Sequence, residues 1–549
     1  MKKEILYYTL ISIILVVAYF LLFKFSNLDI TILFSLNIIK LSFVKFIIIL
    51  IPLAICAYLI SKKINIEKIN EKKLMIVIFL FSFLITTFFW NSPQIDPDSA
   101  RYLTHAKDLN VNVGNRGTDM PLIPIIYKIL YTIFGESLII IEAFNSLLYS
   151  SIVFLTFLIA KKLFNKVVGT YAALIFTSMH GVIAWIGLAL VDIPACFFVT
   201  LSLYISIIAF EKKKVHWFLL LTILAILSVL TKMHTAMFFV PPLLIMTLFR
   251  IKNKKLLIAI ILLITIVIMI ILFNLQKIID IGRYALYAGS FNAAASGKGL
   301  LAIIFQIGPV FLLILPGIFF IKKKECLILY SWILIPALPI FLVAYHDTMF
   351  RYYIPATPAI AIISGFMIFK IFKNKKNLAK YTVLLILFSG LIISLFGFVP
   401  LIKNAGDSNL LKAAQYLNKL DNVKTVAVYT SSFTAEETEA NPIFLGQKYN
   451  PEPLVVIFDL YCYKDIVYGG NLGDESNFIR DWTYNYELPK MYINSTKLSQ
   501  AEAAVVIPDY YKTMSNIPNM SLSKSFDGGT RTVLPWYAYV YLRNDLISV

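Results

Sequence analysis

The chain has 549 residues, of which 59% are hydrophobic, and its formal net charge is +19. Soluble globular proteins contain about 45–50% apolar residues, so this composition excludes an ordinary soluble protein and indicates a polytopic membrane protein. The positive charge does not indicate a nucleic-acid partner, because the lysines and arginines lie in short clusters between the apolar runs. Such clusters instead set the orientation of transmembrane helices.

Apolar runs long enough to cross a bilayer recur along the chain and predict about thirteen transmembrane helices. With the N-terminus inside, every large basic cluster falls on the cytoplasmic side, and Lys40 and Lys45 are exceptions. The first run has no small-residue cleavage site, so we expect a retained helix rather than a signal peptide. The predicted spans are residues 5–25, 41–61, 74–90, 138–160, 168–187, 193–210, 216–231, 235–250, 256–275, 301–321, 327–345, 353–372 and 380–400.

A polar stretch separates the third apolar run from the next one. Asp96 and Asp98 flank Pro97, which disfavours helix before it and permits one just after it. The stretch therefore predicts a short helix through residues 100–109 with Asp98 at its start. This places an acid or base at the membrane edge, and a plain helix cap is the alternative. Asp96 and Asp98 could also bind a divalent metal, although a single Asp-x-Asp pair does not by itself identify a metal site.

The predicted topology gathers many ionisable residues at the outer ends of the helices. Such groups are costly in a membrane and commonly functional, although capping and snorkelling would explain some of them. Carboxylates beside cations on one face favour a shared site. The residues are Asp96, Asp98, Arg101, His105, Asp119, Asp192, Lys232, His234, His346, Asp347 and Arg351.

Several other kinds of site find no support in the sequence. Cys56, Cys196 and Cys326 lie in or beside apolar runs and Cys462 is alone in the tail, so no disulfide framework or metal–thiolate site is expected. The chain has no glycine-rich phosphate loop of the nucleotide-binding kind and no zinc-ligand spacing. Nucleotide-driven transport and nucleotide-sugar chemistry are therefore not indicated.

Two segments outside the spans have their own composition. Residues 276–299 form an outer loop rich in small residues, which is either a mobile flap or a simple connector. After about residue 403 the pattern predicts a helix at 410–420 and strands at 424–430, 454–458, 503–507 and 537–542. We expect N-terminal helices in 1–73, a transmembrane catalytic region in 74–402 with a first outer loop at 91–137, and an extracytoplasmic α/β domain in 403–549.

The residue types at the outer face suit sugar transfer from a lipid phosphate carrier. A carboxylate can deprotonate or orient an incoming hydroxyl, and Lys or Arg can neutralise the leaving phosphate. The alternative is a lipid-linked-sugar flippase or secondary transporter, which would place charges near the bilayer midplane and often has repeated halves. No repeat is evident here. A third possible function is a non-catalytic membrane scaffold for the C-terminal domain. The acids and bases gathered on one face argue against it.

Five short motifs lie in order between the predicted helices. They are Asp98-Ser99-Ala100-Arg101-Tyr102, Asp119-Met120-Pro121-Leu122 running to Phe134-Gly135-Glu136, Val191-Asp192-Ile193-Pro194, Leu230-Thr231-Lys232 and Arg351-Tyr352-Tyr353-Ile354-Pro355. With this order and spacing, residues 74–372 resemble the GT-C class of membrane glycosyltransferases, in particular the protein mannosyltransferase and aminoarabinose transferase group. The resemblance implies inverting transfer of mannose or another sugar from a polyprenyl-phosphate donor. The acceptor would be a hydroxyl of a protein, lipid or glycan at the outer face of the plasma membrane.

The resemblance also implies roles for single residues. Asp98 is the expected catalytic residue, and the residues expected to be catalytic or to orient the acceptor are Asp96, Asp119 and Asp192. Met120 stands where some relatives place a phosphate-binding Lys, so this role shifts toward Lys232 or Arg351. The remaining expected phosphate ligand is Arg101, and the expected substrate contacts are Tyr102, His105, His234, His346 and Tyr352.

Two regions depart from the transfer motifs. Two extra N-terminal helices precede the family's usual first helix, and their role is open. The tail after residue 403 matches none of the motifs. We expect it to shape access of the acceptor or to hold a partner, and to carry no catalytic group.

Overall fold

The computed structural model describes residues 2–25, 41–94, 97–107, 121–250, 304, 306–343, 350–404, 409–430, 452–471, 495–507, 517, 519–526 and 538–547. The chain divides into two compact units. Unit 1 consists of Met1–Trp90, Gly117–Ile123 and Ser137–Leu401, and unit 2 consists of Asn91–Arg116, Pro124–Glu136 and Ile402–Val549. The expected span 256–275 and the outer loop 276–299 lie outside the described residues.

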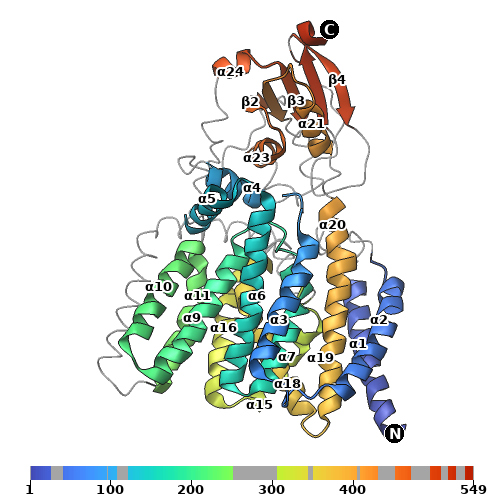
Figure 1. The fold of residues 1–549 in the computed structure, drawn as a ribbon, viewed down its shortest axis with the longest axis vertical. Helices are drawn as coiled ribbons and strands as arrows, with labels where there is room; N and C mark the ends of the chain where they lie inside the picture. Colours follow the sequence, from blue (N-terminus) through green and yellow to red (C-terminus); the bar gives the residue numbers. More distant parts are fainter. Residues whose placement is uncertain are drawn as a thin grey trace. The chain divides into compact units, whose positions relative to one another are not determined.

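Unit 1 is a bundle of apolar helices (Figure 1). In the described part of the chain, six helices are long and apolar enough to cross a membrane, and shorter apolar helices accompany them. Its helices are α1 (Lys2–Phe25), α2 (Phe43–Lys63), α3 (Glu71–Thr86), η1 (Thr87–Phe89), α6 (Leu138–Leu163), α7 (Lys166–Thr177), α8 (His180–Ile183), α9 (Asp192–Lys212), α10 (Val215–Thr231), η2 (Met233–Thr235), α11 (Ala236–Arg250), η3 (Pro309–Leu313), α15 (Ile314–Phe320), α16 (Lys323–Val343), α17 (Phe350–Tyr353), η5 (Ile354–Ala356), α18 (Thr357–Ile371), α19 (Lys376–Ile393) and η6 (Ser394–Phe398), and α20 (Val399–Asn404) leads to unit 2. The protein is therefore an integral membrane protein.

Small residues let the central helices of unit 1 pack closely. A Cβ on Gly365 of α18 would lie 2.8 Å from the backbone nitrogen of Ala172 in α7, so only glycine allows this approach. Close packing of small residues is the usual means of holding transmembrane helices together. Helices α9, α18 and α19 are mostly buried inside the bundle, whereas α2 is mostly exposed.

The basic loops of unit 1 meet at one end of the bundle. The Lys376 ammonium lies 2.8 Å from a carboxylate oxygen of Glu67, and Lys166 donates hydrogen bonds to the carbonyl oxygens of Glu67 and Ile69. The hydrogen bond from Lys376 lowers the pKa of the exposed Glu67 carboxyl. These contacts tie the loop between α2 and α3 to the starts of α7 and α19.

One predicted span is wrong, because residues 168–187 do not form a continuous helix. Helix α7 ends at Thr177, and the short helix α8 follows at His180–Ile183. The break lies where the backbone of Ser178 approaches α19 so closely that a Cβ on Gly390 would lie 1.8 Å from the Ser178 carbonyl oxygen. Hydropathy alone does not reveal such a contact.

Unit 2 combines helices from the first outer loop and from the C-terminal region. Its helices are α4 (Pro97–Lys107), most of α5 (Leu122–Phe134), α21 (Asn409–Asn418), α23 (Glu452–Tyr461), α24 (Ser495–Ser499) and α25 (Asn544–Ile547). Its strands are β1 (Thr425–Thr430), β2 (Asp465–Asn471), β3 (Ala503–Ile507), β4 (Met520–Phe526) and β5 (Ala538–Arg543). They form one sheet in the order β2-β1-β3-β5-β4. Strand β1 pairs in parallel with β2 and with β3, whereas β5 pairs antiparallel with β3 and with β4.

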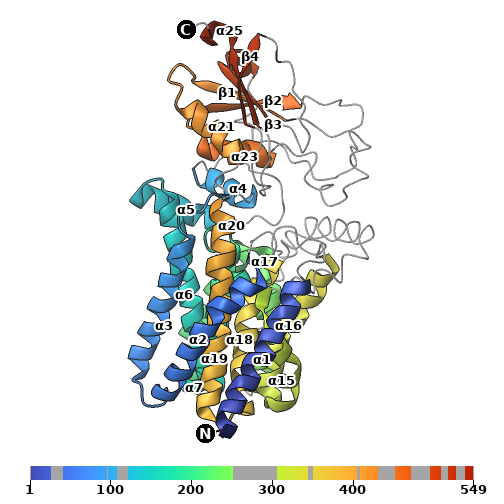
Figure 2. The ribbon, with the colours of Figure 1, turned by 90° about the vertical axis from the view of Figure 1, so that its right-hand side faces the viewer.

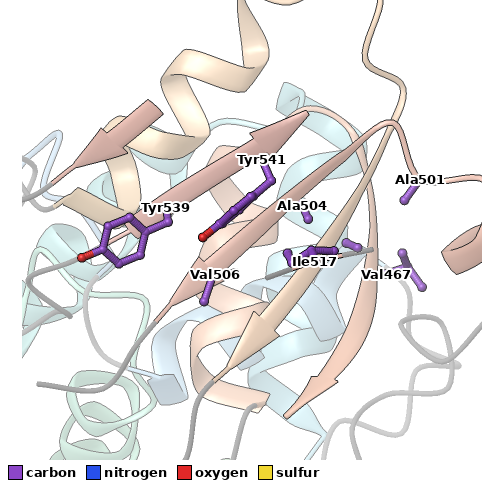
Figure 3. Close-up of a cluster of buried hydrophobic side chains, with 8 residues drawn as sticks. Val467, Ala501, Ala504, Val506, Ile517, Tyr539 and Tyr541 are labelled. Carbon is purple, nitrogen blue, oxygen red and sulfur yellow. The ribbon is translucent and has the colours of Figure 1, made fainter. Parts of the chain in front are cut away.

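One face of the sheet carries a cluster of buried apolar side chains, which come from strands that are paired with one another (Figure 3). Ala427 of β1 is paired with Ala504 of β3, which is in turn paired with Tyr541 of β5. Since side chains alternate across a strand, these residues lie on one face. The buried cluster consists of Ala427, Val467, Ala501, Ala504, Val506, Ile517, Tyr539 and Tyr541.

The strand predicted at 454–458 is wrong, because these residues belong to helix α23. A short apolar run fits a strand and a buried helix equally well. Pro453 is the second residue of this helix, a position where proline favours helix initiation. Val455, Phe458 and Cys462 are buried and follow at spacings of three and four, so the apolar residues line one side of the helix and its C-terminal end.

Candidate active site

Helix α4 in unit 2 carries the expected catalytic carboxylate. Asp98 is the second residue of the helix and not its cap, which corrects the expected helix-cap position. An Arg101 guanidinium nitrogen (Nη1) lies 2.9 Å from Asp98 Oδ1, and the side chains are 2% and 13% exposed. A charge this deeply buried needs a partner. Arg101 therefore orients the Asp98 carboxylate.

The structure describes only some of the other predicted residues of the first outer loop, and these differ in burial. Tyr102 is buried and His105, one turn further along α4, is half-buried. The remaining expected site residues, Asp96, Asp119 and His346, lie outside the described residues, as does Asp347. The expected metal pair of Asp96 and Asp98 thus has one member in the described part. Within that part, no group of three or more His, Cys, Asp or Glu side chains could hold a metal ion.

A buried ion pair in unit 1 joins the start of α9 to the end of α10. Lys232 Nζ donates a hydrogen bond of 2.6 Å to Asp192 Oδ1, and both side chains are almost completely buried. The structure excludes two simpler roles. Asp192 does not cap α9, because Val191 occupies the cap position without a side-chain hydrogen bond. Lys232 is too buried to snorkel to the surface.

Two cations, Lys232 of this pair and Arg351, lie near the aromatic ring of Tyr352. Lys232 Nζ lies 3.8 Å from the centroid of the ring, and the Arg351 guanidinium carbon lies 5.4 Å from it. The His234 ring packs edge-on against Tyr352 with 5.2 Å between the centroids. A cation near an aromatic face is attracted by the ring quadrupole, more strongly where water is excluded. The structure thus brings together Asp192, Lys232, His234, Arg351 and Tyr352.

The cations of this cluster are of the types that bind anionic ligands. Among its described side chains, Asp192 is paired with Lys232, and Arg351 adds a guanidinium. Arg351 is buried as well. A guanidinium binds carboxylate or phosphate oxygens through two parallel hydrogen bonds, whereas an ammonium acts as a point charge. Chemically, the cluster can hold a phosphate group.

The start of α9 and the end of α10 lie at the end of the bundle away from the basic loops (Figure 1). Helix α9 runs from Asp192 to Lys212, and α10 returns from Val215 to Thr231. Asp192 and Lys232 therefore meet at one end of this helical hairpin, while the lysines of the connection at 212–214 lie at the other.

The sequence reading missed polar residues of α6 that support this region. Asn145 is fully buried and donates a hydrogen bond of 3.0 Å from Nδ2 to the carbonyl oxygen of Leu188, just before α9. Ser146 accepts a hydrogen bond of 2.8 Å from the Trp90 indole nitrogen. The available signal was the recurrence of polar residues at helical spacing inside an apolar run. These residues are Glu142, Asn145, Ser146, Tyr149 and Ser150.

Comparison with known families gives a match in sequence to part of the chain. Residues 118–275 match the family model of the dolichyl-phosphate-mannose-protein mannosyltransferases. The matched segment contains Asp119, Asp192 and Lys232, and its sequence extends beyond α11. No curated protein matches the chain in sequence.

Comparison with solved structures gives a match over most of the chain. ArnT from Cupriavidus metallidurans in the apo state is 10% identical with a TM-score of 0.54, over 86% of this chain and 98% of that one. ArnT bound to undecaprenyl phosphate has the same identity and TM-score over 85% and 97%. Archaeal oligosaccharyltransferase AglB from Archaeoglobus fulgidus, in complex with an inhibitory peptide and a dolichol-phosphate, is 11% identical with a TM-score of 0.45, over 79% and 69%.

At 10% identity the likeness to ArnT establishes the fold, and the family match covers the middle of the chain. The protein therefore has the fold of ArnT and, over residues 118–275, matches the family model of the dolichyl-phosphate-mannose-protein mannosyltransferases, which confirms the resemblance found in its motifs.

Proposed function

We propose that the protein is a membrane glycosyltransferase that transfers a sugar from a polyprenyl-phosphate donor to an acceptor hydroxyl, with inversion at the anomeric carbon. The observation that carries the proposal is the cluster around Tyr352, in which Lys232 and Arg351 lie 3.8 and 5.4 Å from one ring centroid. A buried cluster that contains an ammonium and a guanidinium suits the phosphate of a lipid that diffuses in the bilayer. ArnT, which has the same fold, has been solved bound to undecaprenyl phosphate.

The chemistry assigns separate roles to these side chains. Arg351, assisted by Lys232, holds the donor phosphate and neutralises the charge that develops as the bond to the anomeric carbon breaks. Asp192 keeps Lys232 in place. Asp98 accepts the proton of the acceptor hydroxyl as the hydroxyl attacks the anomeric carbon, or it orients that hydroxyl. Asp96 and Asp119 are proposed to assist the acceptor, and His346 to contact the substrate.

We further propose that the reaction takes place at the outer face of the plasma membrane, with the C-terminal region on the same side. The positive-inside rule supports this orientation, because the basic loops gather at one end of the bundle, whereas α9 begins and α10 ends, next to Lys232, at the other. In this arrangement the C-terminal region shapes access of a protein, lipid or glycan acceptor, and it contributes no catalytic group.

The test is sugar transfer by the purified full-length chain in lipid nanodiscs. Undecaprenyl and dolichyl phosphates carrying mannose or aminoarabinose are supplied as donors, and release of the lipid phosphate is followed. Removal of a positioned base costs about 10²–10⁴-fold in rate, so Asp98→Asn should lose that much activity. Asp421→Asn is the matched control, because it removes an exposed carboxylate of the same unit. Full activity of Asp98→Asn, or no turnover of any lipid-linked sugar by the unmodified chain, would disprove the proposal.

A further inference from the structure

The helix that carries Asp98 packs against a helix from the opposite end of the chain. Figures 1 and 2 both show α4 directly beside α23 within unit 2, and α23 forms the largest helix contact of α4 in that unit. Nearly every described side chain of α4 from Ser99 to Ala106 is buried. The position of Asp98 therefore depends on the neighbours that enclose α4.

A hydrogen bond anchors the segment that leads into α4. The Tyr461 hydroxyl, at the end of α23, accepts a hydrogen bond from the backbone N–H of Gln94. Gln94 is buried and lies three residues before the first residue of α4. A buried backbone N–H needs a partner, so this hydroxyl holds the chain at Gln94. Asp98 follows four residues after Gln94.

Hydrogen bonds connect the end of α23 to the last residue of α21 and to the turn that follows α21. Asn418 Nδ2 donates a hydrogen bond of 2.8 Å to the Tyr461 carbonyl oxygen, and Asn418 Oδ1 accepts one of 2.8 Å from the Tyr463 backbone N–H. Lys464 Nζ donates a third, also of 2.8 Å, to the carbonyl oxygen of Leu420. The Tyr461 carbonyl, the Tyr463 backbone N–H and the Lys464 side chain are thus held by three hydrogen bonds, which restrain the place of the Tyr461 side chain.

The far end of α4 is held by a different element. Lys128 of α5 donates a hydrogen bond of 2.6 Å to the carbonyl oxygen of Lys107, the last residue of α4. Helix ends leave carbonyl groups without partners inside the helix, and a cation nearby also suits the helix dipole. Helix α4 is therefore held at its C-terminal end by α5, and Tyr461 holds the chain three residues before the helix.

We propose that Tyr461 is a positioning residue that sets the place of the Asp98 carboxylate through its hydrogen bond to Gln94. The inference rests on the proposed role of Asp98. It assigns the C-terminal region a part in the chemistry without a catalytic group, because α23 controls the geometry of the helix that carries the carboxylate. A displacement of about 1 Å at a reacting group can cost about 100-fold in rate.

The first experiment compares two conservative substitutions in neighbouring tyrosines. Tyr461→Phe removes only the hydroxyl, and we expect kcat to fall about 10-fold while KM for the lipid-linked donor changes less than about twofold. Tyr463→Phe is the matched control, since the Tyr463 side chain is 85% exposed and its backbone contact to Asn418 is unaffected. Equal kcat for the two variants overturns the proposal. A loss of thermal stability in Tyr461→Phe that fully accounts for the lost activity also overturns it.

The second experiment tests whether Tyr461 acts through Asp98. In an Asp98→Asn background, Tyr461→Phe should cause less than about a twofold further loss, because groups that act as a unit are strongly non-additive. A further 10-fold loss would show that Tyr461 acts independently of Asp98, against the proposal. If Asp98→Asn is fully active, the proposed role of Asp98 fails, and an impaired Tyr461→Phe then shows a purely structural contribution. Asn418→Ala, which releases the end of α23, should reproduce the kcat effect of Tyr461→Phe.

Discussion

Lys232 and Asp192, 40 positions apart in the sequence, form a buried ion pair with 2.6 Å between Nζ and Oδ1. The pair joins the end of α10 to the start of α9 beside the ring of Tyr352. Taking two charges out of water is costly, and removing only one partner leaves the other buried without compensation. The pair therefore holds the hairpin closed and keeps the ammonium at a fixed place near Arg351.

The first prediction concerns the stability of this pair. Asp192→Asn and Lys232→Met should each lower the free energy of unfolding by about 3–5 kcal/mol, because each leaves one buried charge. The double variant should lose much less than the sum, since it contains no uncompensated charge. Thermal unfolding of the purified variants in detergent measures this coupling. Additive losses would show that the two side chains do not stabilise each other.

The second prediction concerns Arg351 as a phosphate ligand. Arg351→Ala should weaken binding of undecaprenyl phosphate about 10- to 100-fold, the range expected for a lost hydrogen bond to a charged group. Arg351→Lys should recover only part of the affinity, because an ammonium cannot form the two parallel hydrogen bonds of a guanidinium. Lys376→Ala is the control, since it removes an exposed cation at the basic end of the bundle. Unchanged binding by Arg351→Ala would exclude this role.

The third prediction separates the ring of Tyr352 from its hydroxyl. Tyr352→Phe keeps the aromatic face beside Lys232 and Arg351, so it should bind undecaprenyl phosphate nearly as well as the unmodified chain. Tyr352→Leu removes the face and should weaken binding about 2- to 30-fold, the range expected for a cation–π contact. Titration with the lipid in nanodiscs compares the two. Equal weakening by both substitutions would point to the hydroxyl instead.

The fourth prediction concerns the buried thiol that follows α23. Burial raises the pKa of Cys462 to about 12, so the folded thiol stays protonated at neutral pH. We expect maleimide at pH 7.5 to label Cys462 only after unfolding. In a Cys462→Ala background, Tyr463→Cys should react within minutes, because that position is exposed. Rapid labelling of Cys462 in the folded chain would contradict its burial.

The same shift has a consequence for stability at alkaline pH. The unfolded thiol loses its proton above an ordinary pKa of about 8.5, whereas the folded thiol keeps its proton until about pH 12. Between these values the unfolded state binds fewer protons, so the free energy of unfolding should fall as the pH rises. Cys462→Ala should remove this contribution to the pH dependence. An unchanged pH dependence in the variant would assign the alkaline loss to other groups.

Several features of this protein follow from its sequence because they depend on local composition. An apolar run of about 20 residues generally forms a helix in a bilayer, since every backbone polar group needs a partner and a helix supplies it within the run. Helices α2, α6 and α9 accordingly form at the predicted places. Strands β1 and β3 likewise form where β-branched and apolar residues alternate or cluster.

The local hydrophobic pattern did not predict the structure where two backbone conformations fit the same residues. Residues 454–458 fit a strand or a helix, and helix α23 forms with Val455 and Phe458 buried on one face. The apolar run at 168–187 fits a single span, yet it breaks where Ser178 meets Gly390. In the second case a contact with a distant segment accompanies the break, and in both cases the hydrophobic pattern alone fits more than one conformation.

The candidate site likewise has features that the sequence predicts and features that only the tertiary structure reveals. Its residue types were evident in the sequence, because charged side chains at helix ends in an apolar chain are conspicuous. Their partners were not: Asp192 could cap a helix or act on a substrate, and only the return of α10 beside α9 gives it Lys232. Tyr461 and Gln94 are 367 positions apart and belong to no motif. Composition and spacing determined the membrane helices and the kinds of chemistry available, whereas the tertiary structure decided which charges are paired, since pairing depends on distances that no local pattern encodes.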